Sequence, residues 1–142
     1  MDYQTIKYEK VDHIATNTLN RPERHNANKS VINDELNVAW KDFRDDDVLV
    51  AIITGAGDKA FRAGFDLEDA AADNFEFTDY EKYRQDIYNC EGYCGYTKRA
   101  DIFKPFIAAV NGYVVAAGME RAMLADIRIC AKNAQFSATE RR

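Results

Sequence analysis

An α/β fold is predicted for this chain by three features of its sequence. Segments with the patterns of strands and helices alternate along it, which is the order expected for a sheet covered by helices. A continuous apolar run at 48–55, VLVAIITG, has the composition of a strand that is buried on both faces. The 142 residues are 30% charged and 46% hydrophobic, as is ordinary for a globular protein, and a single domain is expected over 1–142.

The N-terminal part of the chain predicts a hairpin followed by a helix. Residues 3–9 alternate between polar and apolar, and 13–19 is the expected antiparallel partner across a turn at Asp12. A helix is predicted over 30–45, with Ser30 as its N-cap. Its apolar residues recur at helical spacing and define one buried face: Ile32, Leu36, Trp40 and Phe43.

The strand–helix alternation continues through the rest of the chain. The run at 48–55 leads into a Gly- and Ala-rich loop at 55–67. The polar, Tyr-rich segment 78–101 is predicted to be helical. The remaining predicted elements are a strand, a helix, a strand and a short strand, at 105–112, 116–125, 126–131 and 134–138.

Charge and hydropathy exclude several classes of protein. The chain carries 19 Lys and Arg against 24 Asp and Glu, a net charge of −5, whereas a nucleic-acid-binding surface is usually basic. No apolar run approaches the roughly 20 residues that a membrane span needs. The N-terminal segment MDYQTIKYEK lacks the apolar core of a signal peptide, so a cytoplasmic protein without nucleic-acid or membrane partners is expected.

The cysteines predict neither a disulfide nor a metal site. Their number is odd, which with no signal peptide indicates reduced thiols. Cys90 and Cys94 lie four residues apart, but zinc needs about four ligands and no second Cys or His pair accompanies them. Cys130 ends an apolar run and is expected to be a small core residue.

The segment Gly55–Ala60 matches G-x-G-x-x-A directly after a strand, the pattern of a dinucleotide-binding loop. That pattern also requires a helix to begin inside the motif. Here the chain continues into Phe61–Gly64 with another glycine and no helical periodicity. The match therefore does not predict nicotinamide or flavin binding.

Four stretches, in this order, resemble the crotonase superfamily, also called the enoyl-CoA hydratase/isomerase family. They are TLNRPERHNA (18–27), ITGAGDKAFRAGFDL (53–67), FIAAVNGYVVAAGMERAMLADIRICA (106–131) and AQFSATE (134–140). The resemblance implies a spiral of ββα units, of which 1–142 is the N-terminal portion without the C-terminal helical region that builds trimers. It also implies a homo-oligomer, a trimer or hexamer in relatives. The ligand would be an acyl-CoA substrate, with coenzyme A entering as part of it and no separate cofactor.

The chemistry of a thioester enolate explains the small residues in these stretches. Two backbone N–H groups must point at the thioester oxygen as it gains negative charge, and losing one such donor costs about 3–4 kcal/mol. The resemblance places these donors at Phe65, in AGFDL, and at Ala117, in AAG at a helix N-terminus. Taken one at a time, each stretch is also what any tight turn or helix start looks like.

Two departures from the family pattern concern the same pocket. Ala116–Ala117–Gly118 stands where many relatives carry a run of glycines, and the alanine methyl groups narrow the pocket. Phe65 stands where many relatives carry a small residue. Its ring is expected either to close off part of the acyl site or to stack on an aromatic acyl group.

Two glutamates match the acid and base of the family's hydratases. Glu120 follows Gly118 by two positions and Glu140 lies twenty residues further on. Two carboxylates can share the activation of water and the delivery of a proton, at about 10²–10⁴-fold per well-placed group. The alternatives are a first-turn carboxylate stabilised by the helix dipole and a solvated surface charge. Retaining both glutamates favours hydration of a 2-enoyl-CoA over the isomerases and hydrolases of the family.

The resemblance also implies contacts to the coenzyme A part of the substrate, from two loops that follow the first hairpin and the 48–55 strand. They are Arg24, Ala27, Ala63, Asp66 and Leu67. For any single basic residue, a solvated surface charge is the competing interpretation. A function from another class also stays open, namely a truncated, non-catalytic module that binds acyl-CoA or a partner chain.

Overall fold

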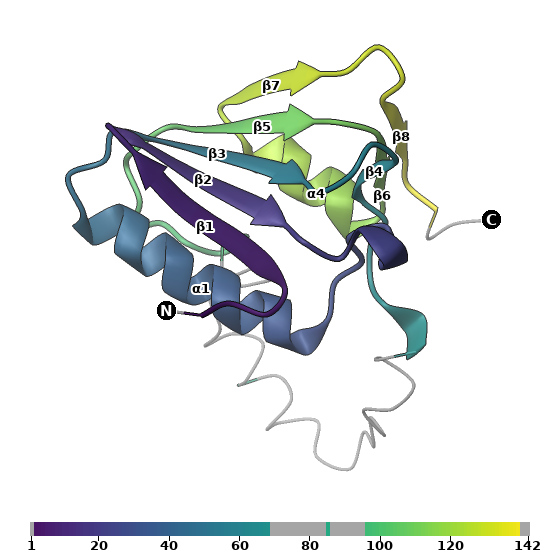
Figure 1. The fold of residues 1–142 in the computed structure, drawn as a ribbon, viewed down its shortest axis with the longest axis horizontal. Helices are drawn as coiled ribbons and strands as arrows, with labels where there is room; N and C mark the ends of the chain where they lie inside the picture. The colour runs from purple at the N-terminus through teal and green to yellow at the C-terminus, as the bar shows by residue number, and fades with distance from the viewer. Residues whose placement is uncertain (1, 69–84, 86–95, 140–142) are drawn as a thin grey trace.

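The computed structural model describes residues 2–68, 85 and 96–139 (Figure 1). They form two β-sheets, with helices packed on one face of the larger sheet. The larger sheet contains, in spatial order, β1 (Ile6–Val11), β2 (Ile14–Leu19), β3 (Val50–Gly55), β5 (Phe106–Val110) and β7 (Ile127–Cys130). The smaller sheet contains β4 (Ala60–Arg62), β6 (Tyr113–Val115) and β8 (Gln135–Ser137). The predicted α/β class is confirmed.

The predicted hairpin is formed by β1 and β2, which pair antiparallel with Ile6 opposite Leu19. Asp12 turns the chain with a φ of 53°, in the left-handed region that Asp tolerates better than most residues. The first strand begins at Ile6 and not at residue 3 as predicted, because Thr5 bonds to the following helix. Its N–H and hydroxyl both donate hydrogen bonds to the carboxylate of Glu35 on the following helix. Strands β2, β3, β5 and β7 then run parallel to one another.

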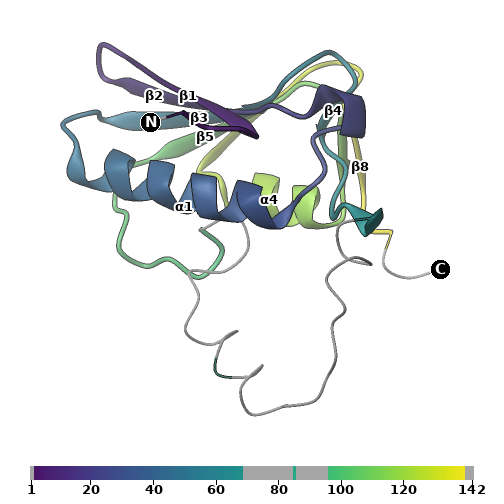
Figure 2. The same ribbon diagram turned by 60° about the horizontal axis from the view of Figure 1, so that its bottom comes forward.

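Helix α1 (Ser30–Asp45) lies along the larger sheet on the same side as α4 (Ala117–Leu124), as Figure 2 shows. Its N-cap is Lys29, which has an extended backbone, and Ser30 is the first helical residue. The N-cap therefore lies one residue before the predicted Ser30. The apolar face is as predicted, because four side chains are fully buried against the sheet: Ile32, Leu36, Trp40 and Phe43.

The expectation that the 48–55 strand is buried on both faces is wrong. Along β3, Ala51 and Ile53 are fully buried, whereas Val50 and Ile52 are only partly buried. The reason is that helices cover one face of the larger sheet, and no described helix lies on the other (Figure 2). Cys130 is exposed, not in the core as predicted, because β7 is the last described strand of its sheet.

The sequence does not predict the smaller sheet, since β4 lies in the predicted loop at 55–67 and β6 lies between the predicted elements at 105–112 and 116–125. Its strands have only three residues each, too few for an alternating pattern to stand out. After the hairpin, successive strands enter the two sheets in turn, so that β3, β5 and β7 join one sheet and β4, β6 and β8 the other. This alternation brings the ends of β4, β6 and β8 to the N-terminus of α4.

Some predictions fall on residues that the structure does not describe. Cys90, Cys94 and most of the predicted helix at 78–101 lie outside the described residues, although Tyr96 packs on Trp40 and Phe106 in the core. In the described ranges, no helix combines the length and the apolar character needed to cross a bilayer. The same ranges hold no cluster of three or more His, Cys, Asp or Glu side chains that could bind a metal ion.

Candidate active site

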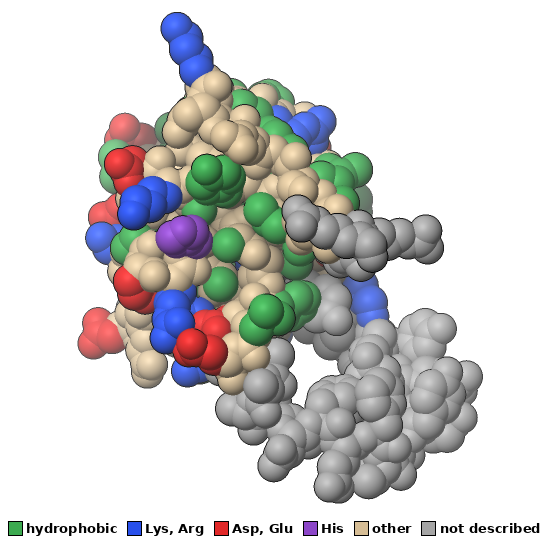
Figure 3. Space-filling view, turned by 90° about the vertical axis from the view of Figure 1, so that its right-hand side faces the viewer, with side chains coloured by type: hydrophobic (Ala, Val, Ile, Leu, Met, Phe, Trp, Pro, Cys, Tyr) green, Lys and Arg blue, Asp and Glu red, His purple; other side chains and the backbone are tan. Residues whose placement is uncertain are grey.

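A pocket of about 440 Å³ opens where the loop after β4, the N-terminus of α4 and the end of β8 meet. It joins predicted residues from segments more than fifty positions apart. Figure 3 shows the face of the molecule that includes these elements, with hydrophobic side chains gathered across its middle and many charged ones to the left. The residues that line the pocket are Ala63, Phe65, Leu67, Ala116, Ala117, Glu120 and Thr139.

The first predicted donor, Phe65, lies in a loop that is held by a neighbouring strand-like segment. The Asn28 N–H donates to the Gly64 carbonyl at 2.6 Å, and the Asp66 N–H donates to the Asn28 carbonyl at 2.9 Å. In a planar trans peptide the N–H points opposite to the C=O. Because the Gly64 carbonyl faces Asn28, the Phe65 N–H points away from Asn28. Gly64 makes this turn with a φ of +92°, which suits glycine.

The second predicted donor, Ala117, is the first residue of α4. The Ala116 carbonyl accepts the N–H of Met119 at 2.8 Å and that of Glu120 at 3.3 Å, so it points along the helix. By the same peptide geometry the Ala117 N–H points out of the helix N-terminus, where the helix dipole is positive. Ala116 achieves this with a φ of 52° and a ψ of −125°, a combination that disfavours residues other than glycine. Its own N–H is tied to the Ser137 carbonyl of β8 at 3.0 Å.

The two donor loops pack directly on each other. A Cβ added at Gly64 would lie 3.1 Å from the Cβ of Ala116. A Cβ added at Gly118 would lie 2.5 Å from the Arg62 carbonyl oxygen, closer than real contacts allow, so β4 approaches α4 only because glycine is there. This close approach brings Phe65 and Ala117 to the same pocket.

Of the two predicted acid–base glutamates, only Glu120 lies within the described residues. Glu120 is exposed, lies in the first turn of α4 and lines the pocket beside Phe65 and Ala117. Glu140 lies outside the described residues, and Thr139, the residue before it, lines the same pocket. The structure therefore groups both predicted donors with one of the two predicted acid–base groups.

A buried arginine that the sequence analysis missed holds α4 in place. Arg121 is fully buried, and its guanidinium carbon lies 4.9 Å from the centre of the Trp40 ring and 5.4 Å from that of Tyr96. Cation–π stacking of this kind joins α4 to α1. The signal was invisible in the sequence, because an Arg next to Glu120 in a helix resembles an ordinary surface residue.

The predicted coenzyme A contacts lie in two loops that an ion pair joins. Arg21 binds Asp66 at 2.8 Å and donates to the Ala27 carbonyl at 2.9 Å. Arg24 pairs with Glu68 at 2.8 Å, and the hydrogen bond to this carboxylate raises the pKa of the Arg24 guanidinium. Ala63 and Leu67 line the pocket itself. The partner of Arg21 lies 45 positions away in the chain and could not be identified from the sequence.

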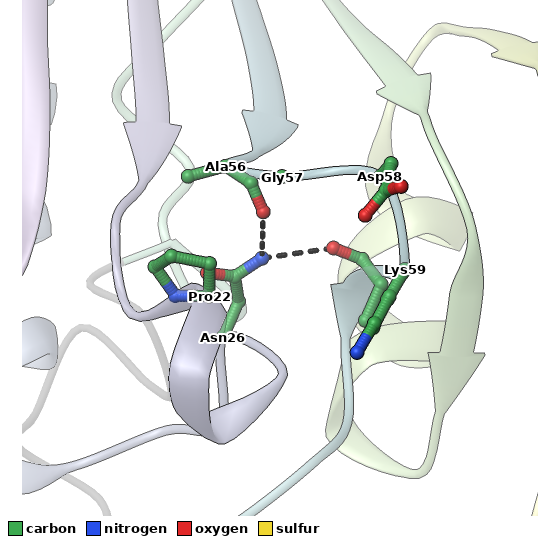
Figure 4. Close-up of a pocket in the computed structure, with 7 residues that line it drawn as sticks. Pro22, Asn26, Ala56, Gly57, Asp58 and Lys59 are labelled. Carbon is green, nitrogen blue, oxygen red and sulfur yellow. Dashed lines mark hydrogen bonds between the residues drawn. The ribbon is translucent and has the colours of Figure 1, made fainter.

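The loop that resembles a dinucleotide-binding motif is built around Asn26, as Figure 4 shows. The Asn26 amide donates to the carbonyls of Ala56 and Ala60, at 3.0 and 2.8 Å. A smaller pocket of about 200 Å³ lies beside it, lined in part by Pro22 and Lys59. Strand β4 begins at Ala60, so the segment lacks the helix that a dinucleotide-binding motif requires.

Comparisons with known proteins agree on one family. A model of the enoyl-CoA hydratase/isomerase family matches residues 9–142. Carnitinyl-CoA dehydratases of Salmonella enteritidis and Citrobacter koseri are 42% identical over 124 residues, which is 87% of this chain and 44% of theirs.

Solved structures give the same result. A carnitinyl-CoA dehydratase from Mycobacterium avium matches with a TM-score of 0.79 and 33% identity, covering 96% of this chain and 50% of that one. An enoyl-CoA hydratase from Mycobacterium marinum matches with a TM-score of 0.78 and 31% identity, covering 96% and 49%. The chain thus spans about half the length of the relatives it matches.

Proposed function

This chain belongs to the enoyl-CoA hydratase/isomerase family, and from that premise we propose that its pocket hydrates a 2-enoyl-CoA to a 3-hydroxyacyl-CoA. One observation carries the proposal. The pocket brings Phe65, Ala117 and Glu120 together from segments that are distant in the sequence.

The first step is to hold the thioester oxygen. Its carbonyl would accept hydrogen bonds from the N–H groups of Phe65 and Ala117, which become stronger as the enolate forms. Support comes from the peptide orientations described above and from the position of Ala117 at the start of α4. The substrate's coenzyme A part would contact Arg24, Ala27, Ala63, Asp66 and Leu67.

The second step adds water across the double bond. The oxygen of water bonds to C3, one of its protons leaves to a carboxylate, and a proton is delivered to C2. Glu120 and Glu140 would share these transfers as general base and acid. We propose no metal and no separate cofactor for this chemistry, and a homo-oligomeric, cytoplasmic enzyme as its setting.

A second candidate is the dehydration of carnitinyl-CoA, the activity after which the 42% identical relatives are named. It is the same chemistry in reverse, because water leaves a 3-hydroxyacyl thioester to give a 2-enoyl thioester. The donors and carboxylates would keep their roles. The two candidates therefore differ in the acyl group and not in the catalytic residues.

The decisive test is Glu120→Gln. With crotonyl-CoA, the loss of the enoyl absorbance band should slow by about 10²-fold or more, because a general acid or base is removed. Calorimetric titration should give a Kd within a few-fold of the unmodified chain, since the amide keeps the shape of the carboxylate. Glu9→Gln, at an exposed position on β1, is the matched control and should leave both measurements unchanged.

Several outcomes would overturn the proposal. Turnover within about threefold of the unmodified chain would remove Glu120 from the chemistry, since a general acid or base contributes at least about 10²-fold. A double-bond shift in a 3-enoyl-CoA without water addition would select the isomerase alternative. Binding of crotonyl-CoA without any turnover by the unmodified chain would select the non-catalytic module.

A further inference from the structure

The side chain of Phe65 is not used by the mechanism above, which needs only its backbone N–H. Phe65 nevertheless lines the pocket and is 42% exposed. Leu67, which lines the same pocket, is 80% exposed. We propose that the Phe65 ring determines specificity by favouring acyl groups that carry a quaternary ammonium over neutral acyl groups of the same shape. This inference rests on the proposed function, because it places the thioester oxygen at the N–H groups of Phe65 and Ala117.

Geometry supports a contact between the ring and the acyl chain. Phe65 supplies both the N–H donor to the thioester oxygen and the aromatic ring. The acyl chain, which extends from the carbonyl carbon, therefore begins beside that ring. In a 4-ammoniobutanoyl group the cation lies three carbon atoms beyond the carbonyl. Attraction between a cation and an aromatic face operates within about 6 Å of the ring centre, which such a short chain can satisfy.

The charge of the pocket also favours a cation. Among the described residues that line it, the one ionisable side chain is the carboxylate of Glu120, and the others are apolar except for Thr139. Ala63, Ala116 and Leu67 offer apolar surface to methyl groups of an ammonium. A lysine or arginine in their place would repel the same ligand.

The competing role for Phe65 is simple apolar packing, which would favour a neutral group at least as well. Two saturated ligands separate these roles, because they have the same shape and differ in charge. They are 4-(trimethylammonio)butanoyl-CoA and 5,5-dimethylhexanoyl-CoA, in which a tert-butyl group replaces the trimethylammonium. Neither has a double bond or a 3-hydroxyl group, so only binding is measured.

The experiment determines the ratio of the two Kd values by calorimetry for the unmodified chain, Phe65→Leu and Phe65→Trp. We expect the unmodified chain to prefer the cationic ligand and Phe65→Leu to lower the preference about two- to fivefold. Phe65→Trp should preserve or raise it, because the indole face attracts cations more strongly. Each variant's ratio is internally controlled, so a general loss of affinity does not imitate the effect.

Equal Kd values for the two ligands in the unmodified chain would overturn the inference while leaving the proposed function intact. So would a preference that survives Phe65→Leu and disappears in Glu120→Gln, since the carboxylate alone would then explain it. If Phe65→Leu fails to fold, a Phe65→Trp ratio clearly below that of the unmodified chain overturns the inference. Failure of both ligands, and of crotonyl-CoA, to bind would overturn the proposed function together with it.

Discussion

At the scale of single residues, Ala116 shows how backbone conformation orients the N–H group of the next residue. Its ψ of −125° sets the orientation of the next peptide and turns the Ala117 N–H out of the helix. A non-glycine residue in such a region costs about 1–3 kcal/mol. The hydrogen bond from its N–H to Ser137 and the helix that follows keep it there.

Replacing this residue with glycine should relieve the strain. We expect Ala116→Gly to raise the free energy of unfolding by about 1 kcal/mol, the released strain less the greater flexibility of glycine in the unfolded chain. Urea denaturation followed by circular dichroism measures it. The matched control is Ala117→Gly, at the first position of the helix. Ala117 has no positive φ to relieve, so this change should lower the free energy of unfolding through the greater flexibility of glycine in the unfolded chain. A loss of stability in both variants would show that Ala116 is not strained.

At the scale of elements, α1 depends on a residue that lies far from it in the sequence. The Lys104 ammonium donates hydrogen bonds to the carbonyls of Phe43 and Asp46, at 2.8 and 2.5 Å, and lies 5.3 Å from the centre of the Phe43 ring. The last carbonyl groups of a helix have no N–H partner within the helix, so a donor from elsewhere can satisfy them. A cation at this end also interacts favourably with the helix dipole. The cap therefore ties the loop before β5 to the end of α1.

Lys104→Met keeps most of the side-chain length and removes the charge and the donors. We expect the free energy of unfolding to fall by about 1–2 kcal/mol, because hydrogen bonds from charged groups contribute this much when partly buried. Chemical denaturation is again the measurement. Lys132→Met, at an exposed position, should change it by less than about 0.5 kcal/mol. Equal effects of the two substitutions would contradict the role of Lys104 as a cap.

At the scale of the whole molecule, both sheets end in strands with exposed apolar side chains. All four residues of β7 are exposed, with Ile127 at 53% and Ile129 at 61%. Nearby on α4, Met123 is 64% exposed, and Phe136 on β8 is 45% exposed. An exposed edge strand with apolar side chains is a template for pairing with another chain.

We therefore expect the 142-residue chain to self-associate as its concentration rises. Ile129→Lys should weaken this association by about tenfold or more, because charged side chains on an edge strand oppose pairing. Sedimentation velocity over a range of concentrations measures it. Val38→Lys, which removes an exposed apolar side chain from α1, is the control and should have little effect. A chain that stays monomeric throughout would contradict the prediction.

The sequence by itself determined the elements with strong local periodicity and the motifs of the family. Helix α1 was predictable because Ile32, Leu36 and Trp40 repeat at helical spacing. Glu120, Phe65 and Ala117 could be proposed as site residues because the motifs that contain them are contiguous. Only the tertiary structure decided which face of β3 is covered, that β4 and β6 form a second sheet, and that Arg21 joins Asp66. The physical reason is that periodicity reports local geometry, whereas burial, pairing and the meeting of Phe65 with Ala117 depend on residues brought together from distant parts of the chain.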